Sequence, residues 1–328
     1  MTSKAQFIQA LLADQASIPA LAVGEAFAPS NIALVKYWGK RDRDFNLPVT
    51  GSLSISLGEK GAFTRIRLSE QNTHSVHLNG TPIQAESTFH RRLSEFLNLI
   101  KPGATHFYEV ETTMNLPVAA GLASSACGFA ALVKAFAQLY AWNLPEPILS
   151  ILCRMGSGSA CRSLWQGFVE WHAGERDDGL DSFAEPLPYS MPELAIGLCI
   201  LTQAEKAIPS REAMNITTRT SILYEAWPKQ VAEDLRLMRY ALQTEDFALL
   251  GQTAERNALA MHATMLASTP AVCYFLPETL AVMQQVWQLR QAGIAVYFTE
   301  DAGPNLKLLA KRCDISKIDA VISGVEWI

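Results

Sequence analysis

The chain has 328 residues, of which 49% are hydrophobic and 18% charged, and its formal net charge is -5. This length is enough for one large domain or two ordinary ones. The negative charge argues against a nucleic-acid binder, whose affinity depends on basic surface, but it allows a small polyanionic substrate if positive charges are concentrated locally. The six cysteines are scattered, which favours buried free thiols of a reducing compartment over disulfides or a metal site. The first 21 residues resemble neither a signal peptide nor a membrane span, so we expect a cytoplasmic protein.

The first half of the chain predicts a strand-rich sheet interrupted by helices, on the period of its apolar residues. The predicted strands are 26–38, 52–57, 63–68, 75–78, 105–113 and 167–171. A tight turn is predicted at Asn79-Gly80. The predicted helices are 3–13, 86–100, 126–140 and a short one that Pro145 and Pro147 open and that ends near Gly156.

The composition changes where Pro186, Pro188 and Pro192 cluster. We place a domain boundary there, which gives predicted domains of residues 1–188 and 189–328. Beyond the boundary, helices are predicted at 211–226, 229–242, 245–262 and 277–291, and strands at 195–201, 294–299 and 319–326. The fold class that these patterns predict is α+β, in two lobes with a cleft between them.

The small residues 121–128 lie on a loop that leads into the N-terminus of the predicted helix 126–140. A helix N-terminus offers unpaired N–H groups and the positive end of a dipole, which together favour an anion. Ser124 and Ser125 add hydroxyl groups that can also face a magnesium ion. No lysine follows the glycines, so this is not a Walker A loop. Phosphate binding and a helix cap that binds nothing are equally compatible with these residues.

A basic segment lies at the end of the first predicted strand, where Lys36 and Lys40 flank Tyr37 and Trp38. A solvated basic rim is one interpretation of such a charge run. Lys36, however, follows four apolar positions, which favours a partly buried place. A buried lysine requires an anionic partner.

Residues 156–162 read Gly-Ser-Gly-Ser-Ala-Cys-Arg. Alternate serines, flexible glycines and the planar fork of Arg162 can enclose a carboxylate or a phosphate. A helix start capped by serine, with Arg162 on the surface, explains the same residues equally well.

A third cluster ends the predicted strand 294–299, where Glu300 and Asp301 precede a Gly-Pro-Asn turn. Neighbouring side chains on a strand face opposite ways, so at most one of the two carboxylates points into a cleft. Asp301 is a candidate general base, and equally a candidate turn-capping residue.

Four sequence blocks, taken together, resemble the diphosphomevalonate decarboxylase family of the GHMP kinase superfamily. The blocks are 31–42, 117–126, 156–163 and 301–305, with supporting stretches at 208–211 and 261–264. The resemblance runs from about residue 26 to the end. Kinases of the superfamily share the glycine loop but not the Lys-Tyr-Trp-Gly-Lys block. The chain departs from the family's usual Pro-x-Asn-Ser-Ser pattern at Thr50 and Gly51, and keeps Ser52 and Ser54.

The resemblance implies a two-lobed GHMP-kinase-like fold, with an N-terminal lobe resembling a small-subunit ribosomal protein domain and a ferredoxin-like C-terminal lobe. It also implies ATP-dependent, Mg²⁺-assisted conversion of (R)-5-diphosphomevalonate to isopentenyl diphosphate, CO2, ADP and phosphate, in the mevalonate pathway of isoprenoid biosynthesis. A homodimer is the family expectation. The alternatives are a phosphomevalonate decarboxylase, a mevalonate 3-kinase-like enzyme, a non-catalytic small-molecule sensor, and an interaction protein that uses its Met and Trp residues as a surface.

The resemblance assigns roles to particular residues. Asp301 would orient and deprotonate the substrate hydroxyl beside Lys36, and Arg162, oriented by Asn31, would hold the substrate carboxylate. The diphosphate would be bound by Tyr37, Trp38, Gly39, Lys40, Ser157, Gly158, Ser159 and Arg211. The ATP phosphates would be bound by Ala120, Gly121, Leu122, Ala123, Ser124 and Ser125, with Ser125 also the candidate Mg²⁺ ligand.

Overall fold

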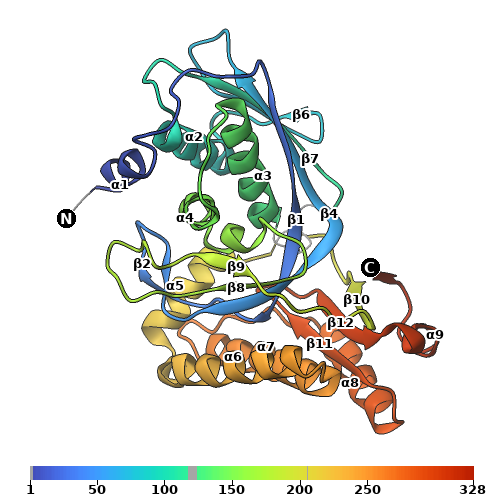
Figure 1. Cartoon of the computed structure of the whole chain (residues 1–328). Coiled ribbons are helices and arrows are strands. Elements are labelled where there is room, and N and C mark those ends of the chain that lie inside the picture. The colour runs from blue at the N-terminus through green and yellow to red at the C-terminus, as the bar shows by residue number, and fades with distance from the viewer. Residues whose placement is uncertain (1–2, 117–123, 205) are drawn as a thin grey trace.

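The computed structural model describes residues 3–116, 124–204 and 206–328. In this part of the chain, two groups of helices and strands lie one above the other as two lobes (Figure 1). The α+β character expected from the sequence is confirmed.

The larger sheet belongs to the N-terminal lobe, and its strands follow the order β6-β5-β7-β4-β8-β9, with β1 paired to β4. Its strands are β1 (Gly24–Val35), β4 (Ser52–Leu68), β5 (Ser75–Leu78), β6 (Thr81–Pro82), β7 (Tyr108–Met114), β8 (Phe168–Trp171) and β9 (Ala184–Pro186), and a separate two-stranded ribbon is formed by β2 (Lys40–Asp42) and β3 (Leu47–Pro48). The predicted strands 52–57 and 63–68 are one continuous strand, β4. Gly58 and Gly61 look like a turn in the sequence. Gly61 instead lies where β1 approaches closely, since a Cβ there would meet the carbonyl oxygen of Ala28 at 2.1 Å.

Helices cover one side of this sheet (Figure 1). They are α1 (Lys4–Leu11), α2 (Thr88–Ile100), α3 (Ser124–Leu139) and α4 (Glu146–Gly156). The helix α3 packs on β1 and β4, and its Phe129 and Phe136 join a core with Phe96 of α2 and Tyr108 of β7. This packing fixes the position of the N-terminus of α3, which the sequence selected as an anion site.

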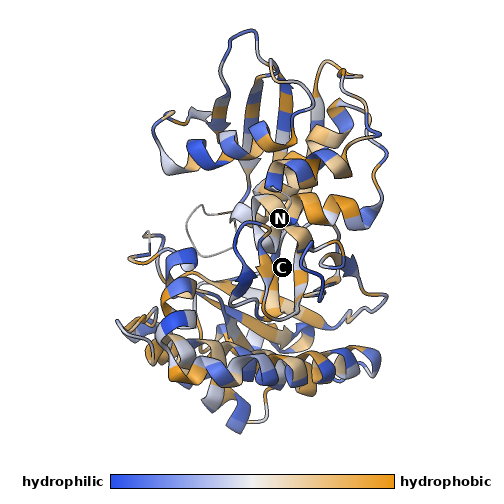
Figure 2. Cartoon of the chain, turned by 90° about the vertical axis from the view of Figure 1, so that its left-hand side faces the viewer, coloured by the Kyte–Doolittle hydropathy of each residue, from blue (hydrophilic) through white to orange (hydrophobic). Residues whose placement is uncertain are grey.

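The C-terminal lobe contains a four-stranded sheet of order β11-β12-β10-β13. Its strands are β10 (Leu194–Cys199), β11 (Val296–Glu300), β12 (Leu306–Lys311) and β13 (Val325–Trp327), and its helices are α5 (Ser210–Thr220), α6 (Trp227–Gln243), α7 (Phe247–Leu266), α8 (Pro277–Gln291) and α9 (Ile315–Asp319). Short 3-10 turns are η1 (Gly158–Arg162) in the N-terminal lobe, and η2 (Ile222–Ala226) and η3 (Arg312–Asp314) here. Hydrophilic and hydrophobic residues alternate along the helices of the C-terminal lobe, at the bottom of Figure 2, as in amphipathic surface helices.

The lobes share a hydrophobic core. Ile32 and Leu34 of β1 belong to the same buried cluster as Leu250 of α7 and Leu309 of β12. The change from one sheet to the other falls between β9 and β10, close to the boundary drawn from the prolines. That 1–188 and 189–328 are separate domains stays a prediction.

Most predicted elements are present, and α8 has the expected bounds, 277–291. The predicted strand 319–326 is wrong in most of its length, because residues 320–324 form turns between α9, which ends at Asp319, and β13, which occupies only 325–327. Ile318 of α9 and Ile322 in the following turn are buried in the same core cluster. Strand β12 was not predicted, since a six-residue apolar run after a turn fits a helix equally well.

Two expectations from composition can be compared with the described residues. Cys127, Cys153, Cys161 and Cys199 are buried and form no disulfide among the described residues, whereas Cys273 and Cys313 are exposed. No helix among the described residues is both long and apolar enough to cross a bilayer.

Candidate active site

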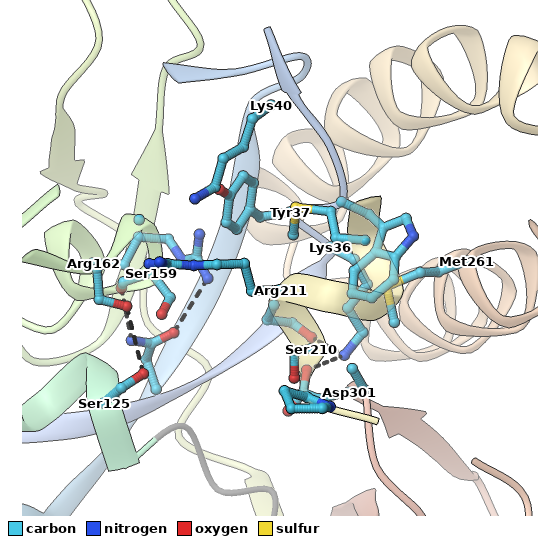
Figure 3. Close-up of a pocket in the computed structure, with 18 of the residues that line it drawn as sticks. Lys36, Tyr37, Lys40, Ser125, Ser159, Arg162, Ser210, Arg211, Met261 and Asp301 are labelled. Atoms are coloured by element: carbon cyan, nitrogen blue, oxygen red, sulfur yellow. Dashed lines mark hydrogen bonds and ion pairs between the residues drawn. The ribbon is translucent and has the colours of Figure 1, made fainter. Parts of the chain in front are cut away.

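A pocket of about 390 Å³ lies between the lobes, with walls from both. It brings together most of the residues that the sequence selected from four distant blocks. Those lining it are Asn31, Lys36, Tyr37, Trp38, Lys40, Ser125, Ser157, Gly158, Ser159, Arg162, Arg211 and Asp301. Figure 3 shows the labelled members of this set converging from both lobes.

The remaining selected residues lie elsewhere. Residues 120–123, expected to bind ATP phosphates, lie outside the described residues. Ser124 is the first residue of α3. Gly39 is not a lining residue of the pocket. Its φ of 113° lies in the region that favours glycine, and a Cβ there would lie 1.7 Å from the Tyr224 hydroxyl oxygen.

Asp301 lies at the end of β11 between two buried lysines. Lys36 Nζ is 2.8 Å from Asp301 Oδ1 and Lys307 Nζ is 3.1 Å from Oδ2. Both lysine side chains are almost fully buried, whereas a quarter of the Asp301 side chain is exposed. Burial alone would raise the pKa of Asp301, but Lys307 and Lys36 outweigh it and hold that pKa well below its usual range. Asp301 is therefore ionised at neutral pH, with one side open to the pocket.

Lys36 owes its position to the end of β1 and to α7. Its Nζ also donates to the carbonyl oxygen of Ala33 at 2.7 Å, and its backbone N–H donates to Asn257 Oδ1 at 2.7 Å. Asn257 in turn donates to the buried Asp234 of α6 at 2.7 Å. The residue that the sequence placed in a buried setting is thus held from both lobes.

Glu300, the other member of the acidic pair, does not line the pocket, and its Oε2 lies 3.7 Å from His262 Nε2. It is 1% exposed, and neither carboxyl oxygen has a hydrogen-bond partner in the described chain. Burial raises the pKa of Glu300 to about 8, although Lys307 and Lys36 oppose that shift. His262 Nε2 lies 3.2 Å from the Asp301 carbonyl oxygen, and burial, then Lys36, lowers the pKa of His262 to about 3. At neutral pH both groups are uncharged, so Asp301 is the ionised carboxylate of the pair.

Arg162 lies in η1 and is 3% exposed. Its Nη1 donates to Ser52 Oγ at 2.5 Å and its Nη2 to Asn31 Oδ1 at 3.5 Å. Asn31 is itself fixed, because its Nδ2 donates to Ser163 Oγ at 2.7 Å. The buried Nε of Arg162 has no partner among the described residues. A buried donor without an acceptor is costly, so this edge of the guanidinium is suited to an oxygen of a bound carboxylate.

The opposite end of the pocket is basic. Lys40 and Arg211 line it together with Arg92 of α2. The ring of Tyr37 lies against Gly158, where a Cβ would be 3.0 Å from it, so a side chain at 158 would disturb the ring. This end has the composition of a phosphate-binding site.

We expect substrate affinity to fall as the pH rises through about 8. Burial, then the nearby Arg211, Arg92, Lys4 and Arg43, lowers the pKa of Lys40 to about 8. Lys40 is protonated below that pH and loses its charge above it, so an anion binds less tightly there. The measurement is kcat/KM against pH for the wild type and Lys40→Arg.

Arginine keeps its charge above pH 8, so Lys40→Arg should shift the alkaline decline in kcat/KM upward. Glu300 ionises in the same range, but Lys40→Arg leaves Glu300 in place, so only the part of the decline that Lys40 causes should move. An unchanged decline in Lys40→Arg would remove Lys40 as its cause.

Four lining or adjacent residues were not selected from the sequence. Lys307 was missed, although a lone lysine in an apolar strand is the signal that identified Lys36. Ser52 was noted only as part of a family pattern. Lys206 donates to the Ala302 carbonyl oxygen at 2.6 Å and to Ser210 Oγ at 3.0 Å, and lies in a polar stretch without periodicity. Arg92 lies on the predicted helix 86–100, where only the apolar positions had been assigned a role.

The fold and the pocket between its lobes define the class of protein as GHMP-kinase-like. Residues 28–184 match the family model "Diphosphomevalonate decarboxylase-like N-terminal domain", and residues 196–325 match "Mevalonate 5-diphosphate decarboxylase C-terminal domain". The chain belongs to the diphosphomevalonate decarboxylase family.

Individual relatives agree with this membership. Diphosphomevalonate decarboxylase mvd1 of Aspergillus fumigatus is 37% identical over 321 residues, covering 91% of this chain and 79% of that protein. The crystal structure of mevalonate diphosphate decarboxylase from Staphylococcus aureus matches with a TM-score of 0.86 and 35% identity, over 94% of this chain and 98% of that one. A structure described as MDDEF in complex with MVAPP, AMPPCP and magnesium matches with a TM-score of 0.85 and 37% identity, over 94% and 99% of the two chains.

Proposed function

We propose that this protein catalyses the ATP-dependent decarboxylation of (R)-5-diphosphomevalonate to isopentenyl diphosphate, with release of CO2, ADP and phosphate. The observation that carries the proposal is one pocket with three chemically distinct parts. Asp301 stands between Lys36 and Lys307, the free Nε edge of Arg162 is buried, and the far end is basic. A substrate with a hydroxyl, a carboxylate and a diphosphate fits these three parts.

Each part has a definite chemical task. A tertiary hydroxyl is a poor leaving group until it is phosphorylated, so its proton must be removed and its oxygen aimed at the ATP γ-phosphate. Asp301 is a weak base because its pKa is depressed, and close positioning must supply much of its effect. The two lysines offset negative charge on the transferring group. Arg162 holds the carboxylate until the phosphate leaves and the C–C bond breaks to release CO2.

The N-terminus of α3 is suited to the ATP phosphates. This helix has 16 residues, its Ser125 lines the pocket, and Ser125 Oγ lies 3.4 Å from Ser157 Oγ. Backbone N–H groups at such a terminus donate hydrogen bonds to phosphate oxygens. We assign 120–125 to the ATP phosphates and Ser125 to Mg²⁺, which supplies charge neutralisation when bound. This proposal for 120–123 rests on the sequence resemblance alone.

The deciding experiment follows ADP and CO2 together, using substrate labelled in the carboxyl group. The proposal expects equal amounts of both from the diphosphorylated substrate, and much slower turnover of 5-phosphomevalonate. ADP without CO2 would establish a 3-kinase-like enzyme instead. Preference for the monophosphate would establish a phosphomevalonate decarboxylase, and the absence of both products would indicate a sensor.

A homodimer, a cytoplasmic location and the two domains 1–188 and 189–328 are further proposals from sequence. Analytical ultracentrifugation tests the dimer.

A further inference from the structure

The helix α1 precedes the part of the chain that matches the family model, which begins at residue 28. It is nevertheless docked firmly on the N-terminal lobe. Phe7 and Ile8 are buried in the core of that lobe, and the ring of Phe7 meets that of Phe45 edge-on at 5.1 Å. The Ser3 and Gln6 side chains form a capping box that fixes the first turn. The first turn also carries Lys4, so the position of this lysine is set by packing.

Lys4 faces a second chamber of about 270 Å³ beside the basic end of the pocket. Arg92 and Arg211 line both spaces, so the chamber and the pocket are neighbours across these two side chains. Arg43 and Gly156 line the chamber but not the pocket. Gly156 ends α4 and directly precedes Ser157 of the pocket.

The chamber is strongly cationic for its size. Lys4, Arg43, Arg92 and Arg211 line it against one carboxylate, that of Glu95. Burial lowers the pKa of Lys4, with Asp44 and Glu95 opposing the shift and Arg211 adding to it. Burial also lowers the pKa of Arg92, again with Arg211 adding to it. Placing these cations close together and partly removing them from water costs free energy. An anion bound between them offsets that cost.

We propose that this chamber is a phosphate subsite completed by Lys4, and that it receives the terminal phosphate of the substrate's diphosphate. The proposal rests on the proposed function, since it extends the same substrate beyond Arg92 and Arg211. The ligand chemistry is a phosphate dianion, for which the terminal phosphate and free inorganic phosphate are the two sources. In this arrangement Lys4 of α1 contacts a phosphate group that only the diphosphorylated substrate has, so the enzyme binds the diphosphate more tightly than the monophosphate.

The test compares Lys4→Gln with the wild type, with Lys4→Arg, and with Lys229→Gln as a control for charge removal on an exposed helix position. Glutamine and lysine have similar helix propensity, so α1 should persist. KM and kcat are measured for the diphosphorylated and monophosphorylated substrates. The dissociation constant of inorganic phosphate is measured by calorimetry.

We expect Lys4→Gln to raise KM for the diphosphorylated substrate about threefold to tenfold, a typical effect of losing one charge-assisted contact. The values of kcat and of KM for the monophosphate should stay within twofold, and Lys4→Arg should recover most of the loss. Weaker binding of inorganic phosphate with no change in substrate KM would support the phosphate subsite and assign it to the free ion.

If Lys4→Gln matches Lys229→Gln in all these measurements while the wild type decarboxylates normally, the subsite is overturned and the proposed function stands. If the wild type itself releases no CO2, the proposed function fails. The calorimetric comparison with inorganic phosphate still decides on the chamber in that case.

Discussion

Asp301→Asn is expected to lower kcat by about three to four orders of magnitude while leaving nucleotide and substrate affinity close to the wild type. The amide keeps the shape of the side chain but cannot accept the hydroxyl proton, and general-base groups typically contribute factors of 10² to 10⁴. The loss of its charge also removes the anion between Lys36 and Lys307. Single-turnover ADP release and the dissociation constants of both substrates measure these effects separately.

Glu300→Gln is the matched control, because it makes the same change at the neighbouring carboxyl group. Burial keeps Glu300 protonated at neutral pH, so the amide replaces a neutral group of similar shape and turnover at pH 7 should stay within a fewfold of the wild type. A thermal unfolding curve of Asp301→Asn shows whether the two lysines left without their carboxylate destabilise the fold. A well-folded Asp301→Asn protein retaining a tenth of wild-type turnover would remove Asp301 from the role of base.

The choice between Glu300 and Asp301 shows where sequence reasoning ends. Strand alternation allowed at most one of them to point into a cleft, and of the two only Asp301 lines the pocket. The charge states depend on burial and on Lys307 and Lys36, which come from β12 and from the end of β1. No local pattern around the acidic pair contains that information.

Arg162 illustrates the same limit. From residues 156–162 alone, a surface arginine and an anion-binding arginine were equally supported. Its burial results from the packing of η1 against α3, α4 and β8, and Ser52 of β4 and Asn31 of β1 lie beside the guanidinium. Periodicity, by contrast, was sufficient for elements with long amphipathic patterns such as α8.

Residues on helix surfaces were the hardest to predict. Lys4 and Arg92 occupy polar positions of α1 and α2, where charged residues usually face solvent. They become part of a chamber because these two helices pack together beside the basic end of the pocket. The sequence identified the helices correctly but gave no sign that their polar sides enclose a space.

Arg162→Lys is expected to lower kcat/KM by about 100-fold or more. Arginine holds Ser52 and Asn31 through Nη1 and Nη2 while Nε stays free, and one ammonium group cannot copy this planar arrangement. The loss of about two hydrogen bonds to charged groups, each worth about 1.5–3 kcal/mol, accounts for a decrease of this size.

Arg162→Lys should also affect the two products unequally. Asp301 and the two lysines stay in place, so phosphorylation of the hydroxyl can continue while the carboxylate is poorly held. The expected result is more ADP than CO2 in the labelled-substrate assay, where the wild type gives equal amounts. Arg41→Lys is the control, because the groups that Arg41 bonds among the described residues, the backbone carbonyl groups of 173, 174 and 176 and the exposed Asp177, do not line the pocket. If Arg162→Lys keeps kcat/KM within threefold of Arg41→Lys with equal ADP and CO2, the substrate carboxylate is held by another group, and the free Nε edge of Arg162 is not its binding site.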